Sequence, residues 1–361
     1  MPRSSVIPFG PQHSAFLEPL HLRLDIEEEV VVGAEISYGY NHRGMEHALA
    51  QDFRRSQFLC ERVCGICSFH HSSAYVQAME RLYGIEPPER AKLMRMIMME
   101  AQRLTSHLLA LGHIAETVGY ENLFMQFFRE REEVMMLVNR VSGGRVHYSM
   151  NAIGGLRKDV PYESLKDIES TLDRLEPRLI ELQRIVRKDT TLRKRLIGVG
   201  VLSKEAAFDW CTVGPTARGS GLPHDIRLTG FDGYGVDGVR FSPISYEEGD
   251  CYARTMVRMD EVIQSVYLMR QGINLMRDGP YATTVKGNPP SADAYGRVEA
   301  PRGELMYWIR GKNEVQLDRV KLRTPALVNI PAVTAMIKGA RVADVAPITI
   351  SVDPCICCTD R

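Results

Sequence analysis

Apolar and polar residues alternate along the first part of the chain. The apolar positions fall in two runs that flank a glutamate-rich stretch: Leu20, Leu22, Leu24 and Ile26, then Val30, Val32, Ala34 and Ile36. An apolar residue at every second position is typical of a β-strand with one buried face. The pattern therefore predicts a β-hairpin over residues 20–36, with its other face in water.

Longer stretches follow the spacing of an amphipathic helix. Apolar residues recur every three or four positions over residues 88–113, 165–186 and 247–276. This spacing places them on one helix face, so we expect three long helices. Pro177 should kink or divide the second helix, because proline removes a hydrogen bond from a helix interior. Asp278-Gly-Pro is a stop signal for the third.

The later pattern adds strands. Alternation over residues 305–317 predicts a second hairpin, and alternation over 348–352 predicts a last strand before the final cysteines. Residues 214–249 are rich in Gly and Pro, and we interpret them as a surface loop because they lack the lysine-containing ending of a phosphate-binding loop. The predicted fold class is α+β and mainly α: a bundle of long helices with peripheral β-hairpins.

Composition narrows the classes of function. The 361 residues carry 45 basic and 45 acidic side chains, so the chain shows no basic excess for nucleic-acid binding and no acidic tail. Residues 1–10 lack the apolar run of a signal peptide, and no stretch approaches the ~20 apolar residues that cross a bilayer. We expect a soluble, intracellular chain whose membrane contact would come through partners.

Six of the eight cysteines lie in two clusters at opposite ends of the chain. Each cluster contains a Cys-x-x-Cys pair, in Arg62-Val-Cys64-Gly-Ile-Cys67 and Asp353-Pro-Cys355-Ile-Cys357-Cys358. That spacing lets two thiolates bind one ion, so two pairs could form a four-thiolate site. A redox dithiol would need only one pair.

The type of metal stays open on spacing alone. Structural zinc pairs usually lie roughly 15–20 residues apart, because the ion closes a small local fold. Here nearly 300 residues separate the pairs, in a chain long enough to fold without such a closure. This weakens structural zinc and favours a redox metal or cluster with soft thiolate ligands, among which nickel is included.

His71 supports a metal site near Cys67. The two residues are four positions apart, so they share one face of a helix that begins near Cys67. We therefore predict that the imidazole of His71 hydrogen-bonds a metal-bound thiolate.

Further motifs accompany the cysteines along the whole chain: Gly10-Pro-Gln-His-Ser-Ala, His42-Arg-Gly-Met-Glu46, Ser106-His-Leu-Leu and Ala300-Pro-Arg-Gly-Glu304. With them the chain resembles the large subunits of nickel–iron hydrogenases, and more closely the energy-converting, membrane-bound group of Ech-type and carbon-monoxide-induced enzymes. The same family includes the quinone-facing 49-kDa-type subunit of respiratory complex I, whose members have lost the four metal-binding cysteines that this chain retains. The resemblance implies one catalytic domain over residues 1–361, with the metal buried where the chain ends meet.

The resemblance also implies the ligands. Cys64 and Cys355 match the terminal nickel ligands, and Cys67 and Cys358 match the thiolates that nickel and iron share. The iron of this family carries cyanide and carbonyl ligands. The other four cysteines match no ligand, and we expect them to be small buried residues: Cys60, Cys211, Cys251 and Cys357.

Three charged residues also match family positions. Arg302 matches an arginine over the open face of the metals, and Glu18 matches a proton-relay glutamate near a terminal thiolate. Glu46 matches a carboxylate that binds a second metal, such as magnesium, near the C-terminus of many relatives. Those relatives often end in His where this chain has Arg361. Many are also made with a cleavable extension, which we do not expect here.

The implied activity is reversible cleavage and formation of dihydrogen. Heterolytic cleavage leaves a proton, which a thiolate and then Glu18 would accept; Arg302 would give electrostatic support, because arginine is a reluctant base. The remaining cysteines are too scattered to bind an iron–sulfur cluster, so a cluster-bearing small subunit is implied. The resemblance adds ion-translocating membrane subunits, a ferredoxin-like carrier and a peripheral position on the cytoplasmic side of the membrane. The alternatives are a metal-free quinone-pocket subunit and a structural zinc protein.

Overall fold

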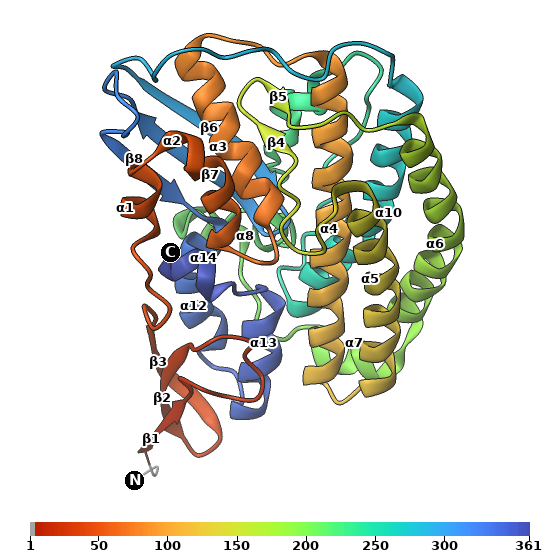
Figure 1. The fold of residues 1–361 in the computed structure, drawn as a ribbon. Helices are drawn as coiled ribbons and strands as arrows, with labels where there is room; N and C mark the ends of the chain where they lie inside the picture. The colour runs from red at the N-terminus through yellow and green to blue at the C-terminus, as the bar shows by residue number, and fades with distance from the viewer. Residues whose placement is uncertain (1–3) are drawn as a thin grey trace.

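Four long helices form one side of the molecule in the computed structural model, which describes residues 4–361 (Figure 1). They are α4 (Glu89–Thr117), α5 (Glu121–Ser142), α6 (Tyr162–Lys188) and α10 (Cys251–Leu275). Helix α4 packs against α5 and α10, and α6 packs against the same two helices. The three helices predicted from the spacing are thus present.

The outer helix α6 shows why the spacing was informative. It buries one stripe of side chains, and its other positions are exposed or partly buried. The stripe consists of Leu165, Ile168, Thr171, Leu172, Leu175, Leu179, Leu182 and Val186. Pro177 lies inside this helix without dividing it. Helix α4 differs, because α5, α10 and the segment 232–235 cover it on several sides, so its polar residues are buried too.

A three-stranded antiparallel sheet stands beside the bundle. It contains β6 (Asp293–Ala300), β7 (Gly303–Arg310) and β8 (Arg319–Arg323) in that order. Helix α3 (Ser68–Tyr83) packs across β6 and β7. The helix approaches closely at Gly296, where a Cβ atom would overlap the backbone of α3.

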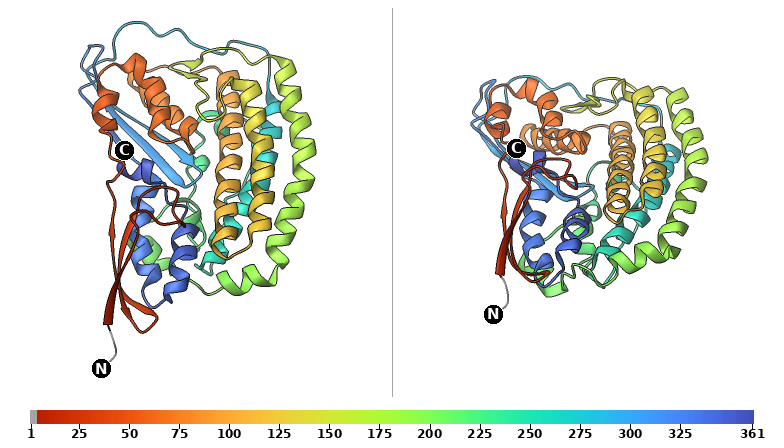
Figure 2. Two further views of the ribbon diagram at one scale, coloured as in Figure 1. Left: turned by 60° about the horizontal axis from the view of Figure 1, so that its bottom comes forward. Right: turned by 90° about the horizontal axis from the view of Figure 1, so that it is seen from below.

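The N-terminal sheet, drawn in red, lies beside the blue C-terminal helices in both views of Figure 2. It contains β1 (Ser4–Phe9), β2 (His21–Glu27) and β3 (Val30–Ser37), all antiparallel. The predicted hairpin is confirmed as β2 and β3, but Val30 and Val32 are exposed and Val31 is buried, because the pairing register shifts between Asp25 and Ile26. In β2 every second side chain, such as Leu22 and Leu24, is fully buried.

Short helices make the remaining connections. Those in the first part of the chain and after α6 are α1 (Met45–Ala50), α2 (Phe53–Leu59), α7 (Thr190–Leu196), α8 (Lys204–Asp209) and α9 (Gly214–Arg218). Those near the C-terminus are α11 (Pro325–Asn329), α12 (Val333–Ile337), α13 (Val345–Ser351) and α14 (Ile356–Asp360). Two strands of two residues each, β4 (Asn151–Ala152) and β5 (Gly155–Leu156), pair with one another.

Three expectations need correction. The predicted strand over 348–352 is wrong, because this segment belongs to helix α13, which is buried on nearly every side. The second hairpin contains β7 as predicted, but its partners are β6 and β8, and residues 315–317 lie in the connection to β8. The segment 214–249 is irregular but not a surface loop, since Arg218, Arg227 and Tyr234 are buried.

Within residues 4–361, no helix is both long enough and apolar enough to span a bilayer.

Candidate metal centre

The first cysteine pair lies at the entrance to α3. A 3₁₀ turn (Cys60–Val63) ends at Cys64, and Cys67 is the residue that precedes the helix. The backbone amides of Ile66 and Cys67 point at the sulfur of Cys64, at 3.2 and 3.4 Å. These two donors favour the thiolate form of Cys64, because they hydrogen-bond its negative charge.

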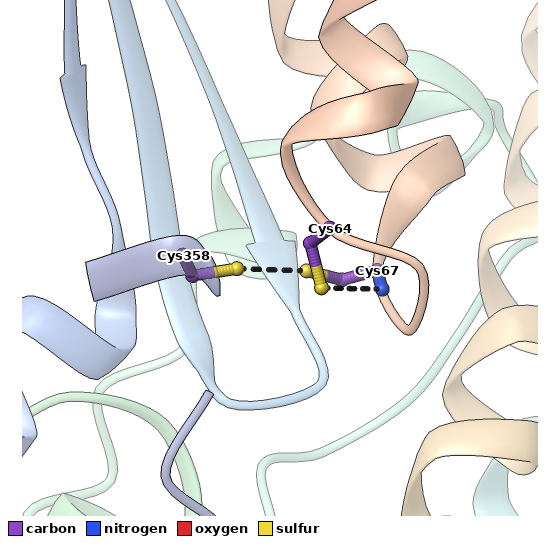
Figure 3. A group of neighbouring side chains, drawn as sticks. All are labelled: Cys64, Cys67 and Cys358. Carbon is purple, nitrogen blue, oxygen red and sulfur yellow. Dashed lines mark hydrogen bonds between the residues drawn. The ribbon is translucent and has the colours of Figure 1, made fainter. Parts of the chain in front are cut away.

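The second pair comes from the last helix. Cys355 precedes α14 and Cys358 lies within it, so the short helix turns both thiols toward α3. The Sγ atoms of Cys64 and Cys355 lie 3.3 Å apart, and those of Cys67 and Cys358 lie 3.4 Å apart. Figure 3 shows Cys358 facing Cys67 across a narrow gap, with Cys64 beside them. The structure therefore brings together the four cysteines that the motifs singled out.

The donor set fits a metal. The four thiols are each at most 2% exposed, so water cannot satisfy them. Two thiolates bound to one ion at ~2.3 Å lie roughly 3.3–3.8 Å apart, which matches both pairs. Sulfur ligands select soft or borderline metals, so the site suits zinc, nickel or an iron-containing centre better than calcium or magnesium.

The four thiols do not titrate alike when no ion separates them. Hydrogen bonds from the other three thiols lower the pKa of Cys64 well below its usual range. The hydrogen bond with Cys355 raises the pKa of Cys358 well above its usual range. A cluster of four close thiols therefore prefers one negative charge, and further deprotonation requires a cation.

Arg302 supplies a fixed positive charge beside the thiols. It lies in the turn between β6 and β7, is 2% exposed, and donates to Asp353 through Nη2 to Oδ1 at 2.7 Å and through Nε to the backbone oxygen at 2.8 Å. Burial alone would lower its pKa, but Asp353 and Cys355 raise that pKa well above its usual range. Arg302 is therefore a permanent cation and a poor proton acceptor.

His71 contacts the cluster at a different cysteine from the one expected. Its Nε2 lies 3.5 Å from the sulfur of Cys358, and its Nδ1 lies 2.7 Å from the hydroxyl of Tyr307. Burial lowers the pKa of His71 to about 4, so the ring is neutral near pH 7. When Tyr307 donates to Nδ1, the proton resides on Nε2 and can be donated to Cys358.

Two family profiles match the chain. The one described as "Respiratory-chain NADH dehydrogenase, 49 Kd subunit" matches residues 117–289 and 282–361, and the one described as "Nickel-dependent hydrogenase" matches residues 43–117. The carbon monoxide-induced hydrogenase of Rhodospirillum rubrum is 36% identical over 98% of this chain and 99% of its own length. The chain belongs to the hydrogenase large-subunit and complex I 49-kDa family.

Other members of the family lie on both of its branches. The membrane-bound hydrogenase subunit alpha of Pyrococcus furiosus is 36% identical, over 98% of this chain and 87% of that protein. A subunit of the NADH-quinone oxidoreductase of Clostridium beijerinckii is 34% identical, over 98% of this chain and 96% of that protein. A chain in the solved structure of the membrane-bound sulfane sulfur reductase, an archaeal respiratory membrane complex, superposes with a TM-score of 0.93 at 27% identity, covering 99% of this chain and 98% of that one. The chain is thus a hydrogenase-related large subunit of the complex I-like oxidoreductases.

The side chain of Glu18, which the resemblance predicts to be a proton relay, contacts the first residues of α14. Its Oε2 accepts hydrogen bonds from the backbone amides of Ile356 at 2.7 Å and Cys357 at 2.9 Å, and its Oε1 contacts the thiol of Cys357. Burial and this carboxylate raise the pKa of Cys357 to about 12, so the thiol stays protonated and can donate to Glu18. Sequence patterns assigned Cys357 no role, because its contact partner lies more than 300 residues away.

The remaining cysteines differ in burial. Cys60 and Cys251 are fully buried, as expected for small core residues. The expectation fails for Cys211, which is exposed, and for Cys357, which is only partly buried. Cys211 follows the short helix α8, in a turn where its φ is 53°.

The surroundings of Glu46 do not fit a second metal. Its carboxylate accepts from the Leu322 amide at 3.0 Å and pairs with Lys321 at 3.0 Å and with Arg361 at 3.2 Å. Two cations and an amide occupy the directions that a metal ion would need, and a divalent cation would meet two like charges. We therefore assign no reaction step to a metal at Glu46.

The C-terminal helix is fixed to the loop before α1. The carboxylate of Asp360 accepts from the amides of Gly39 and Asn41, both at 2.8 Å, and its carbonyl lies 2.7 Å from Nδ1 of His42. These contacts position the helix that carries Cys355 and Cys358, which explains how the two chain ends hold one site.

Proposed function

We propose that this chain is the catalytic subunit of a nickel–iron hydrogenase within an energy-converting membrane complex. The observation that carries the proposal is the meeting of four buried thiols, from opposite ends of the chain, beside a buried arginine. Cys64 and Cys355 would bind nickel alone, and Cys67 and Cys358 would be shared with iron. When bound, such a centre supplies the redox and Lewis-acid chemistry for heterolytic cleavage of dihydrogen.

The chain's own residues would arrange the charges around that centre. Arg302 holds a positive charge near the thiols, which stabilises their negative charge in a dry site. His71 would donate a hydrogen bond to Cys358 and so fix the orientation of this thiolate. Neither residue needs to change its protonation state for these roles.

Glu18 would receive the proton of the reaction. Its carboxylate is held by two backbone amides beside Cys355 and lines a small, mostly apolar pocket with Phe16, Leu20 and Ile356. A carboxylate placed between a thiol cluster and the surface can accept a proton and pass it outward. Arg302 cannot replace it, because its guanidinium stays protonated.

Partners would complete the electron path. Within residues 4–361, one group of side chains is placed to hold a metal, and it consists of cysteines of the thiol cluster. The described residues therefore offer no second set of ligands for an iron–sulfur cluster. A small subunit with clusters, a ferredoxin-like carrier and ion-translocating membrane subunits would therefore be required. Several relatives are subunits of membrane-bound respiratory complexes, which supports a peripheral position on the membrane, and we place it on the cytoplasmic side.

Metal analysis tests the proposal directly. The mature protein should contain about one nickel and one iron per chain, and both Cys67→Ser and Cys358→Ser should lose the bimetallic centre. Cys211→Ser is the matched control, because this cysteine is exposed and outside the cluster. Normal nickel content and hydrogen–deuterium exchange in either cluster variant would overturn the ligand assignment.

The same measurement separates the other functions. Relatives that are named as components of NADH-quinone oxidoreductase favour a quinone-facing subunit as the second candidate, and that candidate predicts no bound metal. Zinc at one ion per chain, without iron, would instead indicate a structural site.

A further inference from the structure

Between the long helices and strand β6 lies a network of buried charged side chains that no catalytic role above uses. Each member is at most 4% exposed. They come from α4, α9, α10, β6 and the segment 225–227: Glu100, Arg103, Arg218, Asp225, Arg227, Glu261 and Glu299.

Arg218 links three of the carboxylates. Its Nη2 lies 2.7 Å from Oε1 of Glu261, and its Nη1 lies 2.7 Å from Oε1 of Glu299 and 3.6 Å from Oδ2 of Asp225. One guanidinium therefore compensates parts of three negative charges.

Two further arginines share the remaining carboxylate. Glu100 lies 3.1 Å from Arg103 and 3.3 Å from Arg227, and it also accepts a hydrogen bond from Ser265 at 2.6 Å. Arg227 in turn pairs with Asp225 at 2.7 Å. Glu100 and Asp225 are thus the best-compensated acids of the network.

The network holds four carboxylates but only three guanidinium groups. His107 bonds to Glu261 at 2.8 Å, yet burial lowers its pKa to about 4, so it adds no positive charge near pH 7. Arg258, also on α10, donates to the backbone oxygen of Arg254, and its other guanidinium atoms have no hydrogen-bond partner within residues 4–361. Arg258 is a further buried cation one helical turn before Glu261, but within residues 4–361 it forms no ion pair with these carboxylates. Four carboxylates thus share three guanidinium groups at pairing distance, and an acid without a cation of its own is costly to ionise in a dry interior.

Glu299 is the member best suited to carry the compensating proton. It shares Arg218 with two other acids, and its second oxygen receives only the amide of Ile226 at 3.2 Å. Burial raises the pKa of Glu299 to about 7. The negative charge of Asp225 also raises this pKa, whereas Arg218 and Arg103 lower it. For Glu100, by contrast, burial is outweighed by Arg103 and Arg227, which lower its pKa to about 2.

The place of Glu299 connects it with the metal centre. Strand β6 runs from Glu299 directly into the turn that presents Arg302, three residues later. On the other side, Ile226, whose amide holds the Glu299 carboxyl group, lines a polar cavity of about 540 Å³ together with Arg297 and Asp232. Glu299 is therefore linked through the backbone of β6 to the arginine beside the thiols, and through the Ile226 amide to a residue that lines the polar cavity.

We propose that Glu299 binds and releases a proton for the reaction at the thiol cluster, as a second proton-accepting group on the Arg302 side. Uptake forms one O–H bond at the carboxyl group and removes the negative charge of an acid that shares Arg218 with two others. Release toward the cavity breaks that bond, and no electron moves in either step. This role in the reaction rests on the proposed hydrogenase function. The binding of a proton by Glu299 is independent of that function.

Infrared spectroscopy of the intact complex tests the proton itself. The absorption of a buried, protonated carboxyl group should disappear as pH rises through about 7 in the wild type, and Glu299→Gln should lack it. Glu304→Gln is the matched control, because Glu304 lies opposite Glu299 in the sheet but pairs with Arg297 at 2.6 Å. If Glu299→Gln does not fold, Glu299→Asp should still shift the midpoint of the titration. An unchanged band in either Glu299 variant would overturn the assignment.

Hydrogen–deuterium exchange then tests the use of that proton. In a variant with normal nickel and iron, Glu299→Gln should lower exchange at least tenfold and abolish its pH dependence near 7, and Glu304→Gln should change neither. A titrating band together with unchanged exchange would overturn the role in the reaction. Absence of nickel from the wild type would defeat the hydrogenase proposal while the infrared result on Glu299 still stood.

Discussion

Replacing Glu18 by glutamine separates proton transfer from metal binding. Glutamine keeps a carbonyl oxygen that can accept from the amides of Ile356 and Cys357, so the start of α14 should keep its position. The change replaces two charge-assisted hydrogen bonds by neutral ones at a partly exposed site, which should cost only about 1 kcal/mol of stability. The amide cannot carry a proton at neutral pH, however, and a missing proton relay typically lowers a rate by roughly 10²–10⁴-fold.

The assay compares metal content, melting temperature and hydrogen–deuterium exchange in the same preparations. We expect Glu18→Gln to retain nickel and iron, to melt within a few degrees of the wild type, and to lose exchange by about two orders of magnitude or more. Glu18→Asp should recover part of the rate, since it restores a carboxylate. Glu35→Gln is the matched control, because Glu35 is a carboxylate of β3 that pairs with Arg23 and has no contact with α14.

Full exchange in a metal-loaded Glu18→Gln protein would refute this reasoning. The proton would then leave by another group, and Glu299 would be the next to test. Loss of both metals would instead mean that Glu18 positions α14, so that the defect lies in assembly of the site.

Arg218→Met should lower the free energy of unfolding by about 3–5 kcal/mol in a denaturant titration, because it leaves buried carboxylates unpaired; a loss near zero would contradict the network. As pH rises from ~4.5 to ~7, the free energy of unfolding of the wild type, measured by denaturant titration, should fall by up to about 3 kcal/mol relative to that of Glu299→Gln. The reason is that the Glu299 carboxyl group binds its proton more tightly in the folded chain than in the unfolded one. Added magnesium should leave the melting temperature unchanged, because Lys321 and Arg361 already compensate Glu46; a clear rise that Glu46→Gln abolishes would indicate a metal there. Pull-down from solubilised membranes should recover a cluster-bearing small subunit and membrane subunits, and a fully active isolated chain would speak against that assembly.

Local patterns in the sequence determined most of the long elements. The stripe on α6 and the alternation in β2 were readable because each element has one covered and one exposed face. The segment 348–352 misled for the opposite reason. Helix α13 is covered on nearly every side, so its alternating Ile and Val residues mimic a strand although the backbone is helical.

Motif spacing determined the identity of the cysteine cluster, but not its contacts. Two Cys-x-x-Cys pairs indicated one four-thiolate site, and the structure brings these four thiols together. The sequence placed His71 beside Cys67, whereas its imidazole faces Cys358, because helix α3 directs the ring toward α14. Sequence patterns also could not predict the contact between Glu18 and the thiol of Cys357, because these residues lie far apart in the chain.

The buried charge network was decided by tertiary structure alone. In the sequence, Arg218, Asp225 and Arg227 lie in a Gly- and Pro-rich segment that resembles a surface loop. Burial became favourable only because α4, α10 and β6 bring carboxylates to these guanidinium groups at hydrogen-bond distance. The sequence can specify which charges exist and where helices expose them, but the cost of burying a charge depends on partners that only the folded chain brings within reach.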